Sequence, residues 1–259
     1  MIHSFILRVK TIRGDTRVEA TKERGMARKK TPQKVDDIAE AAIACFTDLG
    51  IRRTQMADVA KVAGVSAGTL YLYVTSKEAL FHLAILKVCA RPLENLAFPL
   101  ADPGMKATAA IFAARIAEVR HWPALDEALK PNAKAGMETL RQIGRELYDM
   151  LSEARRAIWL VDQCSSEIAE FEQMHARDLR ARHRDQLAEA AVKAAGRKAA
   201  PSPALILAAR LGIEVVAWAA MHRLRESPVN FIRGLSEADA RETAARSFAT
   251  MLISAAEAE

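Results

Sequence analysis

Residues 62–80 read VAGVSAGTLYLYVTSKEAL, and this stretch decides the fold. Tyr71 and Tyr73 stand two positions apart, shortly after Gly64 and Gly68 and among small alanines. A core helix does not normally place aromatic rings on adjacent sides of a short segment that contains glycine. We therefore expect this stretch to face a partner outside the protein's own interior.

Helix-start and helix-stop signals precede the stretch. Thr31 followed by Pro32 is typical of a helix start. Apolar residues then recur on one helical face until Gly50, which is expected to end the helix. A second helix is expected to begin at Thr54, which would cap it, and to break at Gly64.

Further start signals lie within the stretch and after it. Ser66 is expected to cap a third short helix that runs to about Val74. Thr75 and Glu78 have the spacing of a capping box, which predicts a fourth helix from Thr75 into the mid-90s.

The second and third predicted helices have the pattern of a helix-turn-helix. Ala60 is small where the two helices approach, Gly64 tolerates left-handed backbone, and Val65 is an inward apolar anchor. Ser66 then caps a recognition helix whose side chains would lie at or near the major groove of DNA. The small Ala67 allows the backbone to approach the duplex closely.

Residues 32–90 resemble the DNA-binding domain of the tetracycline-repressor (TetR) family of bacterial regulators. The run DVAKVAGVSAGTLYLYVTSKEALF at 58–81 carries the resemblance, together with its spacing from the first helix. Earlier residues that fit are Ala39, Ala42, Phe46, Gly50 and Thr54. The resemblance covers about a quarter of the chain. Val74 departs from it, because the family usually has Phe after the second tyrosine, and Val gives a smaller inward contact.

The resemblance implies which residues meet DNA. Base and phosphate contacts would come from the start of the recognition helix, and phosphate contacts from the two tyrosines and from Lys77. The amino end of the second helix, capped by Thr54, would point at phosphate, with Arg53 and Lys34 adding charge. The expected DNA-contacting residues are Lys34, Arg53, Thr54, Ser66, Ala67, Thr69, Tyr71, Tyr73 and Lys77.

Positive charge is concentrated at the N-terminus. Residues 1–34 contain ten Lys and Arg against three acids, a net of +7 in a chain whose formal charge is +6. Residues 1–30 are therefore expected to form a basic, disordered arm, either merely solvated or reaching DNA. Met26 opens the segment MARKKTPQKV, and the natural protein is expected to start there.

The rest of the chain, residues 91–259, is expected to be a larger helical domain, which makes the whole fold all-α. Ala is abundant while Gly and Pro number only 11 and 9, which favours helices. The predicted helices cover residues 103–121, 124–130, 134–160, 164–195, 203–226 and 236–257. The helices near 203–226 and 236–257 carry apolar stripes that would close the core or, as we favour, form a homodimer seam.

The resemblance implies that this larger domain binds a small molecule and dimerises. Aromatic and polar side chains on its middle helices are candidates for lining a pocket: Phe112, Trp122, Tyr148, Trp159 and Gln163. The Ala-rich interior favours a hydrophobic ligand. The resemblance also implies a repressor that a small molecule releases from a palindromic DNA operator.

Two rival readings remain open. Two Glu-x-x-His pairs, Glu118 with His121 and Glu172 with His175, have the spacing of a di-iron carboxylate enzyme. Glu138 and Glu214 would complete such a site. Against this reading, the pairs lie at a helix end and in a charge-rich segment. The other rival is a DNA-binding protein that needs no ligand.

We expect a regulator that is no enzyme and has no cofactor, in the bacterial cytoplasm and not in a membrane. The three cysteines are far apart and have no metal-ligand spacing. The longest apolar run, near 204–221, is interrupted by Arg210 and Glu214, which disfavours a membrane span.

Overall fold

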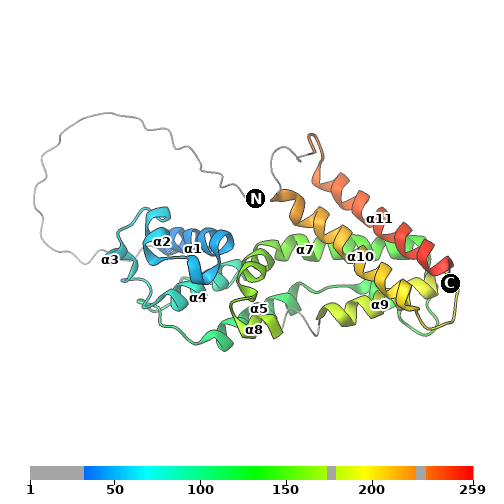
Figure 1. Cartoon of the computed structure of the whole chain (residues 1–259), viewed down its shortest axis with the longest axis horizontal. Helices are drawn as coiled ribbons and strands as arrows, with labels where there is room; N and C mark the ends of the chain where they lie inside the picture. Colours follow the sequence, from blue (N-terminus) through cyan, green and yellow to red (C-terminus); the bar gives the residue numbers. More distant parts are fainter. Residues whose placement is uncertain (1–31, 174–178, 226–231, 259) are drawn as a thin grey trace, which may run out of the picture. The chain divides into compact units, whose positions relative to one another are not determined.

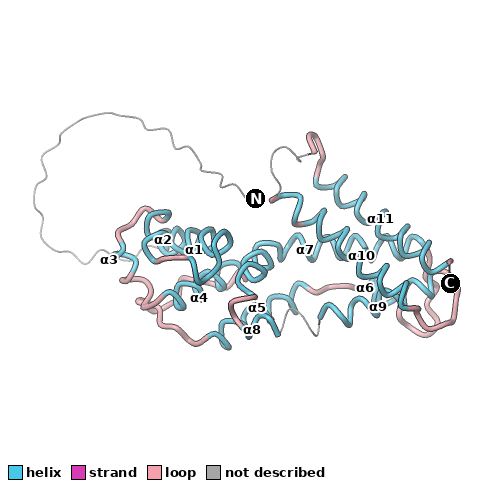
Figure 2. Tube along the Cα trace, in the orientation of Figure 1, coloured by secondary structure: helices cyan, strands magenta, loops and turns pink. Residues whose placement is uncertain are grey.

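The computed structural model describes residues 32–173, 179–225 and 232–258, and every regular element in these ranges is a helix (Figures 1 and 2). This confirms the predicted all-α class. The elements are α1 (Pro32–Arg53), α2 (Met56–Val62), α3 (Ala67–Leu70), α4 (Lys77–Val88), α5 (Met105–Val119), α6 (Pro123–Ala128), α7 (Met137–Ser165), α8 (Ala169–Gln173), α9 (Leu179–Ala194), α10 (Pro203–Ala220), the 3-10 helix η2 (His222–Leu224) and α11 (Glu237–Glu257). The predicted arm, including Met26, lies outside the described residues.

The helices α1 to α4 pack around one apolar core. Ile38, Ala42 and Phe46 on α1 are completely buried, which confirms the predicted inward face of the first helix. The ring of Phe46 meets that of Phe81 on α4 edge-on, with centroids 5.3 Å apart. Gly50 has a φ of 79°, so the regular helix breaks there as expected, although hydrogen-bonded turns continue to Arg53.

The prediction that the fourth helix continues into the mid-90s is wrong. Helix α4 ends at Val88, and Ala90 takes a φ of 54°. Pro92 follows two residues later and disfavours helical backbone at the residue before it. The chain then returns to the segment between α3 and α4, where Leu100 donates its N–H to the Tyr73 carbonyl at 2.8 Å and accepts from the Thr75 N–H at 3.0 Å.

The prediction of a single helix over residues 164–195 is also wrong. Helix α7 extends to Ser165, and a turn separates it from α8. The turn places Phe171 in the interior, where its ring meets Phe81 and Phe112 at centroid distances of 6.0 and 5.9 Å. Burial of this ring explains why the helix is interrupted although the sequence has no glycine or proline there.

Helices α7, α10 and α11 form a second core and lie together in Figure 1. Two glycines allow their close approach. A Cβ on Gly144 would lie 3.0 Å from the Cα of Ala245, and one on Gly212 would lie 3.0 Å from the Phe248 ring. Residues 203–224 are long and apolar enough to cross a membrane, but a core helix passes the same test. Here Leu205, fully buried, is part of the second core.

Candidate nucleic-acid interface

The turn between α2 and α3 has the geometry that a helix-turn-helix needs. Gly64 adopts a φ of 64°, in the left-handed region that favours glycine. The Val65 N–H donates to the Ala60 carbonyl at 2.9 Å, and the Gly64 N–H to the Lys61 carbonyl at 3.2 Å. The chain therefore reverses tightly and α3 starts against α2, as predicted.

Ser66 caps α3 and also orients Thr69. Its Oγ accepts the Thr69 N–H at 3.0 Å, which confirms the predicted cap, and lies 2.8 Å from the Thr69 Oγ1. Ala67 and Gly68 are exposed, whereas Leu70 is completely buried and anchors the helix. The outward surface of α3 is thus small and polar. Regular helix ends at Leu70, earlier than predicted, and hydrogen-bonded turns continue to Val74.

The two tyrosines point in different directions. Tyr71 is 50 % exposed, and Leu72 beside it is 59 % exposed. Tyr73 is only 7 % exposed, and its ring packs edge-on against Phe98 with centroids 5.8 Å apart. The expectation that both tyrosines face outward is therefore wrong for Tyr73. Val74, the departure from the family pattern, is completely buried.

Thr54 does not cap α2. Its side chain is 1 % exposed, and its hydroxyl donates to the Gly50 carbonyl at 2.7 Å, so it is not available to DNA in this conformation. Gln55 is the N-cap, and its N–H donates to the Asp58 carboxylate at 3.1 Å. The backbone at this junction is held by Lys77, whose Nζ donates to the Arg52 and Thr54 carbonyls at 3.3 Å.

The cap of α4 also differs from the prediction. Ser76, not Thr75, is the N-cap, and its Oγ accepts the Ala79 N–H at 3.1 Å. Thr75 instead donates its hydroxyl to the Leu100 carbonyl at 3.2 Å. Because the Thr75 N–H and hydroxyl both donate to Leu100, the hydroxyl of Ser76 caps the helix instead.

The other two predicted cations make internal bonds at helix ends. Lys34 donates from Nζ to the carbonyl of Ala63, the C-cap of α2, at 3.2 Å. Arg53 donates from Nε to the Leu49 carbonyl at 2.8 Å. Both place positive charge near the negative end of a helix dipole, which gives them a structural role whether or not they reach DNA.

The family model described as "Bacterial regulatory proteins, tetR family" matches residues 38–84, which include α2, the turn, α3 and most of α4. Residues 38–84 of this chain are therefore similar to the DNA-binding domain of the tetR family. A relative from Bacillus subtilis (strain 168), the uncharacterized HTH-type transcriptional regulator YvdT, is 40 % identical over 68 residues. The aligned residues are 26 % of this chain and 35 % of the relative, so this chain spans about a third of the relative's length.

Two solved structures of the tetR family are similar over most of the chain. One, from Mesorhizobium loti MAFF303099, is 20 % identical, with 88 % of this chain and 98 % of that chain covered and a TM-score of 0.41. The other, a TetR-like transcriptional regulator from Rhodococcus sp. RHA1, is 19 % identical, with 86 % and 97 % covered and a TM-score of 0.40. The family assignment rests on residues 38–84 and not on these superpositions.

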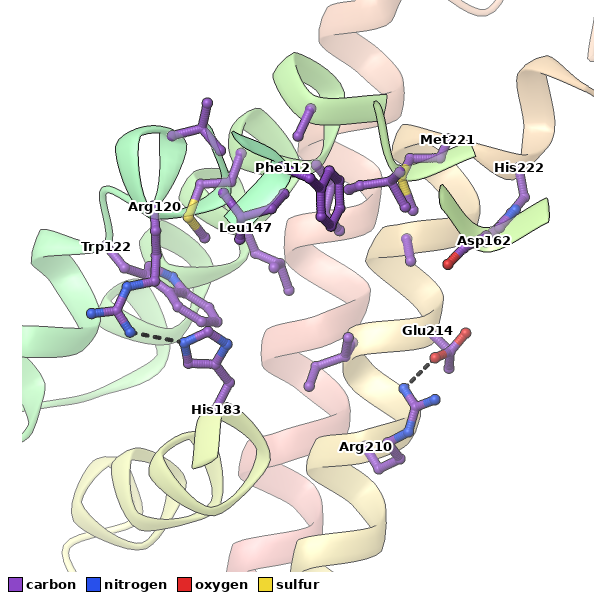
Figure 3. Close-up of a pocket in the computed structure, with 18 of the residues that line it drawn as sticks. Phe112, Arg120, Trp122, Leu147, Asp162, His183, Arg210, Glu214, Met221 and His222 are labelled. Atoms are coloured by element: carbon purple, nitrogen blue, oxygen red, sulfur yellow. Dashed lines mark hydrogen bonds and ion pairs between the residues drawn. The ribbon is translucent and has the colours of Figure 1, made fainter. Parts of the chain in front are cut away.

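A cavity of about 530 Å³ lies among α5, α7, α9 and α10 (Figure 3). Phe112 and Trp122, two of the predicted pocket residues, line it. Sequence reasoning did not name the other lining residues as pocket candidates: Ile116, Val119, Arg120, Leu147, Met150, Leu151, Ala154, Ile158, Asp162, Ser165, His183, Arg210, Ile213, Glu214, Ala217, Met221 and His222. Most of them carry apolar side chains and lie at helical spacing.

The other predicted pocket residues lie elsewhere. Tyr148 is buried, and its hydroxyl donates to the Glu237 carboxylate at 2.8 Å, away from this cavity. Trp159 lies under the guanidinium of Arg225, 5.5 Å from its ring centroid, and lines a separate shallow hollow beside α1. Gln163 is not among the residues that line the cavity.

The acids proposed for a di-iron site do not come together. Glu118 pairs with Arg91 at 2.6 Å, Glu138 with Arg145 at 2.7 Å, and Glu214 with Arg210. His175 and the side chain of Glu172 lie outside the described residues. Within the part that is described, no three His, Cys, Asp or Glu side chains are grouped as a metal ion would require.

The different burial of the two tyrosines predicts different effects of their removal. Tyr73→Ala should lower the free energy of unfolding by about 3 kcal/mol, because it empties a buried ring site. Tyr71→Ala, at an exposed position, should change it by about 0.5 kcal/mol or less. Urea unfolding followed by circular dichroism measures both. Equal losses for the two variants would contradict the assigned orientations.

Proposed function

We propose that this chain is a homodimeric DNA-binding transcription regulator of the bacterial cytoplasm, a repressor that a small, largely hydrophobic ligand releases from a palindromic operator. The observation that carries the DNA-binding part is the outward surface of α3. It combines the Ser66 cap, small exposed side chains and the exposed ring of Tyr71, with a buried anchor at Leu70. Such a surface suits close contact of backbone and short side chains with the major groove.

The roles of individual residues follow from their exposure. Thr69 and Ala67 would meet base edges, because Ala67 is exposed and Thr69 is partly exposed on the first turn of α3. Tyr71 would meet the phosphate backbone, and Lys77 would fix the α1–α2 junction behind the groove. Residues 35–259 carry almost no net charge, so the N-terminal arm would supply much of the electrostatic affinity.

A chain of contacts supports release by a ligand. Asp162 and Ser165, in the last turn of α7, line the cavity. Two residues beyond Ser165, the Glu167 carboxylate accepts the Arg52 N–H at 2.8 Å. A ligand that shifts the end of α7 would therefore pull on the α1–α2 junction, whose position sets the start of the helix-turn-helix.

An exposed apolar stripe on α10 supports the dimer. Leu207, Leu211 and Trp218 are 58 %, 50 % and 40 % exposed and are spaced by four and seven residues, which places them on one helical face. Large exposed apolar patches of this kind mark interaction surfaces. The predicted apolar stripe on α11 packs mostly in the interior of the chain, where Phe248 and Leu252 are completely buried. We therefore assign the apolar part of the seam to α10.

Selection of DNA from a randomised duplex library tests the proposed readout. The wild-type chain should enrich an inverted repeat whose half-site centres are about one helical turn apart. Thr69→Ala should change the enriched bases, whereas Tyr71→Phe should keep them and bind more weakly at every sequence. Identical motifs for the wild type and Thr69→Ala would show that Thr69 does not read bases. Failure to enrich any motif would refute specific DNA binding.

Sedimentation tests the proposed seam. Leu211→Glu should convert the dimer to a monomer at micromolar concentration, because it puts a charge in the middle of an apolar interface. Leu224→Glu is the matched control, since Leu224 is also exposed, at 40 %, but lies on η2 and not on the α10 stripe. A Leu211→Glu variant that remains dimeric would place the seam elsewhere.

A further inference from the structure

The residues that line the cavity of Figure 3 indicate the chemistry of its ligand. We propose that it takes a small organic acid, with the carboxylate at Arg120 and an apolar body against Phe112 and Leu147. The inference rests on the proposed function in one respect only, in that it treats this cavity as the ligand site.

The walls of the cavity select an apolar body. Its volume of about 530 Å³ lies within the range of small-molecule sites, roughly 300–1,000 Å³. Phe112 and Trp122 are 3 % and 5 % exposed and contribute aromatic surface from α5 and the start of α6. Leu147 from α7 and Met221 after α10 lie between the polar groups at the two ends (Figure 3).

One end of the cavity carries a positive charge that no acidic side chain in the described ranges neutralises. The charged lining residues are Arg120, Asp162, Arg210 and Glu214. Arg210 and Glu214 neutralise each other in an ion pair four residues apart on α10. Asp162 lies at the opposite end from Arg120 in Figure 3 and has an interaction of its own. Within the described ranges, Arg120 has no acidic partner.

His183 positions Arg120 without neutralising it. The Nη1 of Arg120 lies 3.2 Å from the Nε2 of His183, whose ring packs edge-on against Trp122 at 5.3 Å. Burial lowers the pKa of His183, and the charges of Arg120 and Arg182 lower it further, so the imidazole is neutral at pH 7 and accepts from Arg120. A guanidinium held in this way presents its remaining N–H groups to a carboxylate.

The charge pattern disfavours the other ligand classes. An amine would need a free acid, whereas Glu214 is paired with Arg210 and Asp162 has an interaction of its own. A neutral apolar compound would fill the cavity but would leave Arg120 without an anionic partner. A dianion would carry one charge more than Arg120 balances into an apolar space, which costs desolvation. A monocarboxylate matches both the apolar walls and Arg120, which is the one cation without an acidic partner among the described lining residues.

Matched acid and alcohol probes test the proposal on the full chain. We would titrate 4-phenylbutyrate against 4-phenyl-1-butanol, and decanoate against 1-decanol, by calorimetry and by tryptophan fluorescence. Each acid should bind at least about fivefold more tightly than its alcohol, the factor that about 1 kcal/mol of an exposed ion pair gives. Arg120→Gln should remove this difference by weakening the acids alone.

Two further variants control for charge and folding. Lys106→Gln removes the same charge from an exposed position on α5 outside the cavity and should leave both affinities unchanged. Arg120→Lys keeps the charge and should restore most of the acid preference. Equal binding of acid and alcohol, no binding of either, or an acid preference that survives in folded Arg120→Gln would each overturn the proposal.

Operator binding by the same preparation separates this proposal from the proposed function. If the acids bind but the operator is not released, the ligand class stands and the proposed release is wrong. If the operator is bound and no acid binds, the ligand class is wrong and the DNA-binding function stands.

Discussion

Both hydrophobic cores depend on one helix, α7. Its first half supplies Leu140 and Ile143 to the core shared with α10 and α11, and its last turns supply Leu160 and Cys164 to the core shared with α1 and α4. A 29-residue helix is about 44 Å long, and its hydrogen bonds keep it from stretching. Helices α1 to α4 are therefore not a domain that is independent of the second core. Under the proposed function, a ligand in the cavity beside α7 would act on them through this helix and through Glu167.

The outward surface of α3 is small because most of the larger side chains around it are buried. Leu70 and Val74 are completely buried, and Tyr73 is drawn inward by Phe98 from the chain segment after α4. What remains outside is a capped first turn with Tyr71 and Leu72. The proposed close approach of the backbone to DNA thus depends on a segment about 25 residues further along the chain, which is hydrogen-bonded through Leu100.

Local signals in the sequence predicted some of the local features, but the caps assigned to Thr54 and Thr75 and the ends of the third and fourth helices were wrong. The Gly64 turn and the Ser66 cap were predictable because each depends on one residue type in one backbone conformation. Where two candidates adjoin, as at Thr75 and Ser76, only the returning chain decides which one caps the helix. The burial of Tyr73, the break before Phe171 and the lining of the cavity all depend on packing between distant segments. Helical spacing marks residues such as Phe112 and Tyr148 as inward, but it does not separate a cavity wall from a solid core.

The central claim is that the outward face of α3 meets DNA, and directed cleavage tests it most directly. The native cysteines are all buried, and burial raises the pKa of the Cys89 and Cys164 thiols to about 12, so an introduced cysteine can be labelled selectively. An iron chelate on Leu72→Cys, bound to the selected operator, should cut both strands near the major groove of each half-site. The same chelate on Leu224→Cys should cut neither. Cleavage from Leu224→Cys but not from Leu72→Cys would contradict the account.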